Sequence, residues 1–513
     1  MINVSDAWKD IQQRFLLPET HIEIDCGVTD DEAQGIATAS GTNQAVFSNT
    51  PGIINGLANI AKYATLELNL WSLDGTQTVL PSLGVHENVG YVSDIESTGS
   101  VTVTFPSLRE TAISGITITW SEKYNEYAKT FSVVGKNGEE IVGEVTVTNN
   151  KDRTSIVYLP LQNYDSITVI VHEWSVPNRR VRIENIVIGH ILKFFKSDLL
   201  SFTHEMDGDL LSGKLPKYSI EFTLDNSDGR WDPNNPMGLG QYLSERQKIT
   251  VKYGLDVNGV IEWIKAGTFY LSEWYAPPNG LEARFVARDV FEFMIGVEMS
   301  NSNTATISEL INSAIPEGFF VVYDSSLPNY TYSYAPATTK DTAAEMVQKC
   351  ANAVGAILRF DREGILHIEP LNKAISEYIY LADTTGIPLA LSYSYPELTL
   401  SKPLKEVSVD YGGESPYVFN NNVSASGEKQ TLANEYIATQ ENAEKAAKWV
   451  SDILKNRKTI SGEFRADPRL DLYDIVRVED RYSRLLTVAI TNIKYTYNGS
   501  FRGSYTGRVL EEV

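Results

Sequence analysis

The sequence predicts a mainly β protein of several domains. The chain has 513 residues, and at roughly 100 to 200 residues per domain it should form three or four domains. Short runs of β-branched and aromatic residues that alternate with polar ones recur along most of the chain, separated by Gly, Asn, Asp and Pro. Such runs are typical of strands with one buried face. Helical spacing stands out in three segments: 3–17, 339–355 and 439–458.

The first segment predicts a short amphipathic helix in an N-terminal arm, residues 1–24. Its apolar residues share one helix face: Val4, Trp8, Ile11 and Phe15. A helix this short, stopped by Pro18, is marginal by itself, so its apolar face must pack against something. Either the arm packs on its own chain, or it clasps a neighbouring subunit. In the second case Trp8, Ile11 and Phe15 are inter-subunit contacts.

Residues 25–190 have the pattern of an antiparallel β-sandwich. From about residue 65 to residue 189 the segment is nearly all strand and turn, with turn signals such as GKNG at 135–138 between the runs. Many short strands at this spacing are typical of a sandwich. The clearest runs are 101–105, 115–120, 130–134, 145–148, 155–159 and 166–171.

Two segments of this sandwich suggest a more specific fold. One is the strand that leads into Trp120, and the other is the closing segment 174–189, which contains RRVRIENIVIG. In these segments the sandwich resembles a discoidin-type, galactose-binding-like jelly roll. The resemblance implies a carbohydrate-binding module in which Trp174, Arg179 and Arg180 contact host cell-surface glycans. Alternatively, Trp174 packs in the core, as large aromatic side chains usually do, and the arginines lie in solvent or at a subunit contact.

Residues 191–300 contain the most informative series of motifs. The alternation in SIEFTL at 219–224 predicts a strand with one buried face, and the turn DNSDGRWDP at 225–233 cannot continue a sheet. The sequences ITVKYG, AGTFYL and LEARFVARD follow, with a hairpin signal at Asn258-Gly259. This order predicts a β-barrel.

The rest of the chain predicts a small α+β domain followed by a helix and further strands. In residues 301–395, a helix that ends at Gly355 leads into the hairpin sequence GAILRFDREGIL. In residues 396–513, a helix over 440–456 capped by Thr439 is followed by FRADPRLDLYDIV, where the chain reverses at Asp-Pro.

These motifs, in this order, resemble phage tail hub proteins of the baseplate or tail tip, over roughly residues 191–513. The resemblance implies two tail-tube-like barrels, 191–300 and 396–513, in a homotrimeric virion protein. Three chains then present six similar barrels to a hexameric tube. The implied partners are a distal tail or tube ring, a tape-measure protein and tip or receptor-binding fibre proteins, and DNA passes through transiently. Asp225, Asp228 and Trp231 become candidate inter-subunit contacts.

Charge and composition narrow the function further. Lys and Arg total 44 against 66 Asp and Glu, a net charge of −22, which argues against gripping nucleic acid by its phosphates. It fits a channel that DNA traverses. The only cysteines, Cys26 and Cys350, indicate no disulfide framework. We expect no secretory signal at the N-terminus and no membrane span, hence assembly in the bacterial cytoplasm and a final location at the virion tail tip.

The sequence offers no recognisable catalytic or metal-binding motif. The six histidines form no metal-binding pair, and the glycine of DNSDG at 225–229 comes too early for an EF-hand loop. Dinucleotide and nucleophile-elbow motifs are missing as well. We therefore expect no enzyme, no cofactor and no metal. Two other classes stay open: a carbohydrate-binding adhesin and a cell-wall-degrading tail enzyme.

Overall fold

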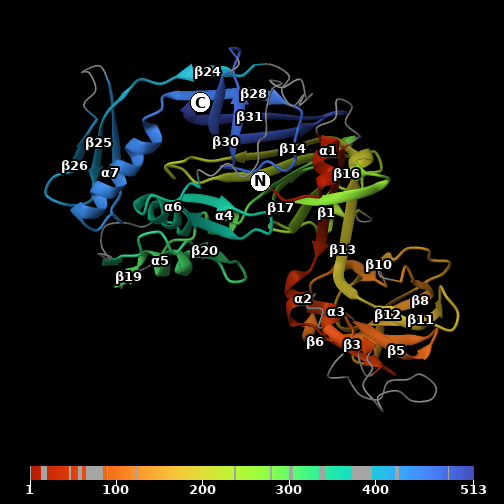
Figure 1. Cartoon of the computed structure of the whole chain (residues 1–513). Helices are drawn as coiled ribbons and strands as arrows, with labels where there is room; N and C mark the ends of the chain where they lie inside the picture. Colours follow the sequence, from red (N-terminus) through yellow and green to blue (C-terminus); the bar gives the residue numbers. More distant parts are fainter. Residues whose placement is uncertain are drawn as a thin grey trace. The chain divides into compact units, whose positions relative to one another are not determined.

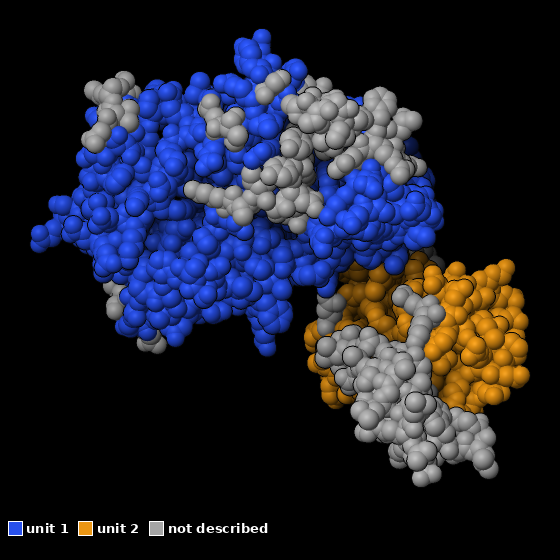
Figure 2. All heavy atoms as spheres, viewed as in Figure 1, with its two compact units in different colours: residues 1–25, 193–229, 248–513 blue, residues 26–192, 230–247 orange. Residues whose placement is uncertain are grey.

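The chain folds into two compact units, coloured separately in Figure 2. The first unit comprises residues 1–25, 193–229 and 248–513, and the second comprises 26–192 and 230–247. In the part of the chain that is described, no helix has the length and apolar character of a membrane span. The computed structural model describes residues 2–12, 20–45, 48–55, 60–64, 85–88, 90–121, 124–235, 238–277, 280–299, 304–333, 341–372, 395–421, 427–482 and 484–512.

The second unit is the expected β-sandwich. Buried side chains from both of its main sheets, such as Val103, Ile118 and Ile167, form one core. One sheet has the order β2 (Thr38–Thr42), β6 (Gly99–Arg109), β11 (Tyr164–Trp174), β8 (Ala128–Asn137), β9 (Glu140–Val147). The other has the order β10 (Thr154–Leu161), β7 (Ile113–Thr119), β13 (Asn185–Phe195).

Short elements complete this unit. They are α2 (Asp31–Ile36), α3 (Gly52–Asn55), the pair β3 (Ile60–Ala64) and β4 (Val85–Asn88), and the pair β5 (Tyr91–Glu96) and β12 (Arg180–Ile183). Residues 230–247, which the sequence placed in the first barrel, belong to this unit instead. They fold on themselves, because Leu239 and Gly240 donate their backbone N–H groups to the carbonyl of Arg230.

The first unit is built on the strands of the two predicted barrels (Figure 1). The first set, module 1, comprises β14 (Leu199–Asp207), β15 (Lys217–Asp225), β16 (Lys248–Val257), β17 (Val260–Tyr275) and β18 (Glu282–Arg288). The second set, module 2, comprises β24 (Glu397–Leu400), β28 (Lys458–Phe464), β29 (Ile475–Glu479), β30 (Leu485–Tyr497) and β31 (Phe501–Glu512).

Both modules have the same topology. If each module's strands are lettered A to E along the chain, both have the spatial order A-B-E-D-C: β14-β15-β18-β17-β16 and β24-β28-β31-β30-β29. Every neighbouring pair is antiparallel. The prediction of a mainly β, multi-domain chain is confirmed. The described pairings do not close two separate barrels, however, because β14 of module 1 also pairs with β30 of module 2 and joins them in one sheet.

Two small α/β parts accompany the modules. The predicted helix α6 (Ala343–Ala353) begins at a capping box of Thr342 and Glu345 and precedes Gly355, which has a positive φ of 71°. The predicted helix α7 (Gln440–Leu454) begins at Thr439, whose hydroxyl accepts the backbone N–H of Asn442. The remaining single elements are α1 (Asp6–Gln12), β1 (Thr20–Thr29), α4 (Phe291–Met294) and α5 (Ile307–Ala314). Two small sheets lie between the modules in the sequence: β19 (Thr304–Thr306) with β21 (Thr331–Ser333), and β20 (Val321–Tyr323), β23 (Leu366–Glu369) and β22 (Ile357–Phe360) in that order. A third small sheet has the order β26 (Tyr417–Asn420), β25 (Leu404–Asp410) and β27 (Glu428–Ala433).

Candidate functional site

The junction between modules 1 and 2 is the candidate functional site. Its backbone part is the antiparallel ladder of β14 and β30, which runs from the pair Phe202 and Tyr497 to the pair Asp207 and Asn492. The Asn492 side-chain amide also donates to Asp207 Oδ1 at 3.2 Å. An edge strand of one module is therefore covered by a strand of the other, which satisfies backbone groups that would otherwise need water.

Aromatic side chains of both modules form a cluster inside the junction. The ring of Tyr253 on β16 lies 5.2 Å from that of Phe501 and 5.9 Å from that of Tyr495, both in module 2. The His204 ring lies 6.0 Å from Tyr495. Each such pair adds about 0.5 to 1.5 kcal/mol beyond the area that it buries. The modules are thus packed on each other like parts of one core.

His204 and Tyr253 are linked by a hydrogen bond within this cluster. Burial, helped by the positive charge of Arg362, lowers the pKa of His204 to about 3, so its imidazole is neutral. Burial raises the pKa of Tyr253, which keeps its phenol protonated. The Tyr253 hydroxyl and His204 Nδ1 share a hydrogen bond of 2.9 Å, in which the tautomer of the imidazole sets the donor. This is a fixed structural contact without a titration near neutral pH.

Arg362 joins both modules to the small α/β part. It lies in the turn between β22 and β23 and is buried. One guanidinium nitrogen donates to the Lys265 carbonyl of module 1 at 2.9 Å, and another donates to the Leu470 carbonyl, in the loop before β29, at 3.0 Å. Its Nε lies 3.6 Å from Asp471 Oδ2. The predicted DREG turn thus positions an arginine that bridges three parts of the fold.

The Asp-Pro-Arg-Leu motif forms the module 2 side of the junction. The carboxylate of Asp467 accepts from Arg469 at 2.7 Å, and both side chains are buried. The backbone carbonyl of Asp467 accepts from the Tyr495 hydroxyl at 2.7 Å. A buried ion pair needs such additional hydrogen bonds to be tolerated. The motif therefore fixes the loop that Arg362 contacts.

The N-terminal arm packs on its own chain. Trp8 and Ile11 of α1 are buried, so their assignment as contacts to a neighbouring subunit is wrong, and Phe15 lies outside the described residues. The Gln12 side chain donates to the Ala466 carbonyl at 3.1 Å, which anchors the arm on module 2. Ser5 donates its backbone N–H to Glu262 of module 1 at 3.0 Å, so the arm contacts both modules.

The turn at 225–233 is only partly a surface feature. Asp225 and Asp228 are exposed, and the Asp225 carboxylate accepts the backbone N–H of Ser227 at 2.9 Å in a local turn. Their assignment as inter-subunit contacts stays a prediction. Trp231 is buried, so its assignment as a surface contact is wrong.

Of the three residues predicted to contact sugar, one is buried and two have accessible side chains. Trp174 is buried, packs edge-on against Trp120 with ring centroids 6.0 Å apart, and donates its indole N–H to Glu126 at 2.9 Å. It therefore offers no face to a sugar, and that assignment is wrong. The Arg179 side chain is 54% exposed and lies 3.6 Å from Glu126, and Arg180 lies 3.6 Å from Asp94. Contact of these arginines with glycans stays a prediction.

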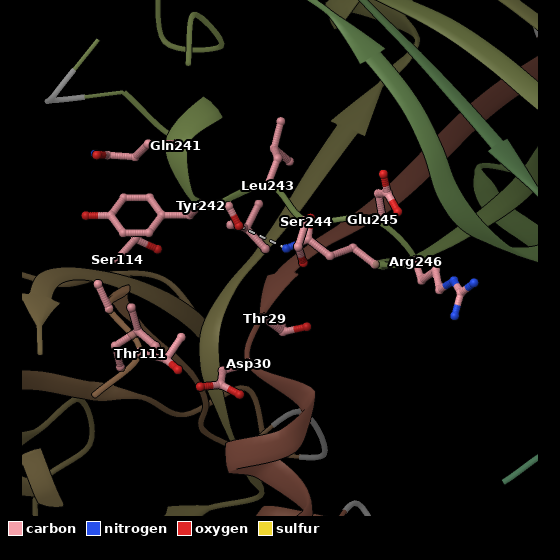
Figure 3. A pocket seen from close by; sticks show the side chains of 14 residues that line it. Thr29, Asp30, Thr111, Ser114, Gln241, Tyr242, Leu243, Ser244, Glu245 and Arg246 are labelled. Carbon is pink, nitrogen blue, oxygen red and sulfur yellow. Dashed lines mark hydrogen bonds between the residues drawn. The ribbon is translucent and has the colours of Figure 1, made fainter. Parts of the chain in front are cut away.

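The second unit also contains a cavity that the sequence did not suggest (Figure 3). It has a volume of about 590 Å³ and is lined by residues 28–30, 111–114 and 241–247. Three segments far apart in the sequence build it, which is why no local motif indicated it. Asp30, one of its carboxylates, is engaged, because it caps Ala33 at 2.8 Å and pairs with Arg109 at 3.2 Å.

A buried Ser-His pair adjoins this cavity. Ser114 Oγ lies 3.2 Å from His190 Nδ1, and His190 Nε2 lies 3.2 Å from the Val157 carbonyl. Burial lowers the pKa of His190. In a hydrolytic Ser-His-Asp triad a carboxylate contacts the second ring nitrogen of the histidine, whereas here a backbone carbonyl does so. We therefore interpret the pair as a structural hydrogen bond. Among the residues described, no group of three or more His, Cys, Asp or Glu is arranged to hold a metal ion.

Comparison with known proteins found similarity in solved structures. No protein-family model matches the chain, and no curated protein matches its sequence. A 43 kDa tail protein of prophage MuSo2 from Shewanella oneidensis is 15% identical, with a TM-score of 0.44 over 62% of this chain and 95% of that chain. A tail protein from Neisseria meningitidis is 12% identical, with a TM-score of 0.47 over 62% and 94%. The prophage tail protein gp18 from Listeria monocytogenes is 10% identical, with a TM-score of 0.40 over 61% and 91%.

Proposed function

We propose that the chain is a structural virion protein, a trimeric hub at the tip of a phage or phage-like tail. The observation that carries the proposal is the shared strand order of modules 1 and 2. Three chains with two modules each supply six similar modules, which can match a hexameric tube or distal tail ring on one side and threefold tip or fibre proteins on the other. Duplicated modules in a closed ring are a simple way to connect rings of different order.

The junction supports this role. A backbone ladder, an aromatic cluster and buried Arg362 hold the two modules together. Rotation of one module against the other would break several buried hydrogen bonds, each of which costs free energy to leave unmade. The pair therefore acts as one rigid part of a ring.

The charge supports a channel function. A net charge of −22 repels DNA over roughly 8 to 10 Å, about one Debye length. DNA and the tape-measure protein are then transient occupants of the channel, while the tube ring and the fibre proteins are its lasting partners. This role needs no catalytic activity and no cofactor.

Glycan contact by the sandwich is a second candidate role. Exposed Arg179, beside buried Glu126, is the observation that favours it. The test is a glycan array with the full chain and with a variant carrying Arg179→Ala and Arg180→Ala. Binding that the variant loses would support the role, and no binding by the full chain would exclude it for the glycans tested.

The test of the main proposal is native mass spectrometry of the purified full chain. The proposal predicts a trimer as the main assembly, and trimer-sized density at the tip of particles that contain the chain. A monomer at every concentration reached, with no particle-bound fraction in producing cells, would contradict it.

A further inference from the structure

The A strands of the two modules have different surroundings. Strand β14, the A strand of module 1, has neighbours on both edges, β15 and β30. Strand β24, the A strand of module 2, pairs with β28 and has no second strand partner among the described residues. All four of its residues are exposed, with Leu398 at 42% and Leu400 at 56%. Module 2 therefore has an uncovered edge at the position that is covered in module 1.

The D strands show the complementary difference. Strand β30 uses one edge for two partners: residues 485–489 pair with β29, and 492–497 pair with β14. Strand β17 pairs with β16 over 260–270, and beyond that point it pairs only with β18, on its opposite edge. In the structure as described, the edge of residues 271–275 that corresponds to the β14 site on β30 has no strand partner.

The surface beside this free edge is suited to a partner. An open hollow of about 390 Å³ lies over this end of β17 and its partner β18, and it is lined by residues 272–275, Arg284 and Val286. The Tyr275 side chain is 67% exposed. An unpaired strand edge favours addition of an extended strand, since its backbone groups are available for hydrogen bonds, and the exposed Tyr275 ring offers an apolar surface to the added strand.

We propose that β24 of one copy pairs in antiparallel orientation with residues 271–275 of β17 in a second copy. Within the chain, the A strand β14 of module 1 pairs with the D strand β30 of module 2. The proposed contact is the same A-to-D pairing between chains, with the A strand from module 2 of one copy and the D strand from module 1 of the next. The partner is therefore a second copy of this chain. The segments have similar lengths, four residues in β24 and five in 271–275. Leu398 and Leu400 lie on the same face of β24, since they are two residues apart in a strand, and they supply exposed apolar side chains for packing against Tyr275.

The contact is head to tail, so repetition produces a ring or an open filament. With three copies it forms a ring of six modules joined by six equivalent A-to-D contacts, three within chains and three between them. The inference rests on the proposed hub function and names the strands that would close its ring.

The test uses the full chain and one matched pair of variants. Leu400→Asp places a charge in the proposed contact, and Val418→Asp places one at an exposed residue of β26 outside it, where the side chain is 43% exposed. We expect Leu400→Asp to weaken assembly about tenfold or more, since it removes one buried leucine from the contact. Val418→Asp should assemble like the parent chain.

Hydrogen exchange distinguishes the possible outcomes. In the trimer, backbone amides of 397–400 and 272–275 should exchange more slowly than in the Leu400→Asp variant. A trimer in which both segments exchange as fast as in that variant overturns the strand pairing and leaves the hub proposal standing. A parent chain that never forms a trimer contradicts the hub proposal and the pairing together.

Discussion

The sandwich core and the junction between modules 1 and 2 are both buried, but they are built from different chemistry. The sandwich core is made mostly of aliphatic and aromatic side chains at alternate strand positions, such as Val103 and Ile167. The junction contains groups that must hydrogen-bond, among them Arg362, His204 and Tyr495. Apolar side chains have no directional bonds, so they can pack in more than one arrangement. A buried polar group, by contrast, costs free energy unless its hydrogen-bond partner is in place. The junction therefore specifies one arrangement of the modules.

The largest loss of stability is expected when a buried charged side chain of the junction is removed. Arg362→Ala removes a buried cation that contacts Asp471 and two carbonyls of different modules. It should destabilise the first unit by roughly 3 to 5 kcal/mol, because it leaves a buried charge without its partner. The measurement is urea unfolding followed by hydrogen exchange of the peptide 485–497.

The matched control is Arg284→Ala. Arg284 makes a bidentate pair with Glu221 at 2.7 Å, but both side chains are about half exposed. Such a surface pair contributes about 0 to 1 kcal/mol. Equal effects of Arg362→Ala and Arg284→Ala would show that the buried contacts of Arg362 do not hold the modules together.

A substitution in the sandwich core tests whether the second unit can be destabilised without an effect on the junction. Ile167→Ala should cost about 2 to 5 kcal/mol through lost burial and a residual cavity. Because Ile167 packs in the core of the second unit, protection from exchange should fall there and stay unchanged in 485–497. Loss of protection in both units would refute the separation of their cores.

A smaller effect is expected for Tyr253→Phe. This change removes the hydroxyl that bonds to His204 Nδ1 and leaves that buried nitrogen without its partner. The free energy of unfolding should fall by about 1 to 3 kcal/mol. Tyr482→Phe is the control, since the Tyr482 side chain is 67% exposed and lies outside the proposed contact between copies. A Tyr253→Phe variant as stable as the parent would mean that the hydrogen bond adds nothing to the packing of the ring.

The pH dependence of stability provides the last test in this series. Asp289, near Arg362, is buried, and burial raises its pKa to about 7, with Glu292 raising it and Arg288 opposing. The pKa in the folded state exceeds the unfolded value, so the protonated form is favoured by folding. Its contribution to stability is complete below about pH 4 and is lost as the pH rises through about 7.

The corresponding variant is Asp289→Asn. It gives up one of two carboxylate oxygens that accept backbone N–H groups of Tyr218 and Phe291, and it removes the group that titrates. The decisive quantity is the slope of unfolding free energy between about pH 4 and pH 8, which should be shallower in the variant. An unchanged slope would contradict the raised pKa of Asp289.

Much of the fold could be predicted from local pattern. The alternation of Ile220, Phe222 and Leu224 with polar residues identified β15, whose buried face is formed by those three side chains. Capping residues located α6 and α7. The burial of Trp174 followed the general tendency of large aromatics, which the sequence had offered as the alternative to sugar contact.

The junction could not be predicted in the same way. Arg362 meets Lys265 and Leu470, which lie 97 and 108 positions away in the sequence, and no local pattern records such a pairing. The DREG and DPRL motifs predicted turns and contributed to the resemblance to hub proteins, but neither indicated a contact between the modules. The contacts that these two turns make at the junction depend on the pairing of β14 with β30. The alternation of apolar and polar residues within each strand does not indicate which strand pairs with which.

The most direct test of the central claim is electron microscopy of the tail tip of particles that contain this chain. The claim predicts three copies that contribute six similar five-stranded modules to one ring, with alternating contacts inside and between chains. A ring built from one module per chain, with the second module elsewhere, would contradict it.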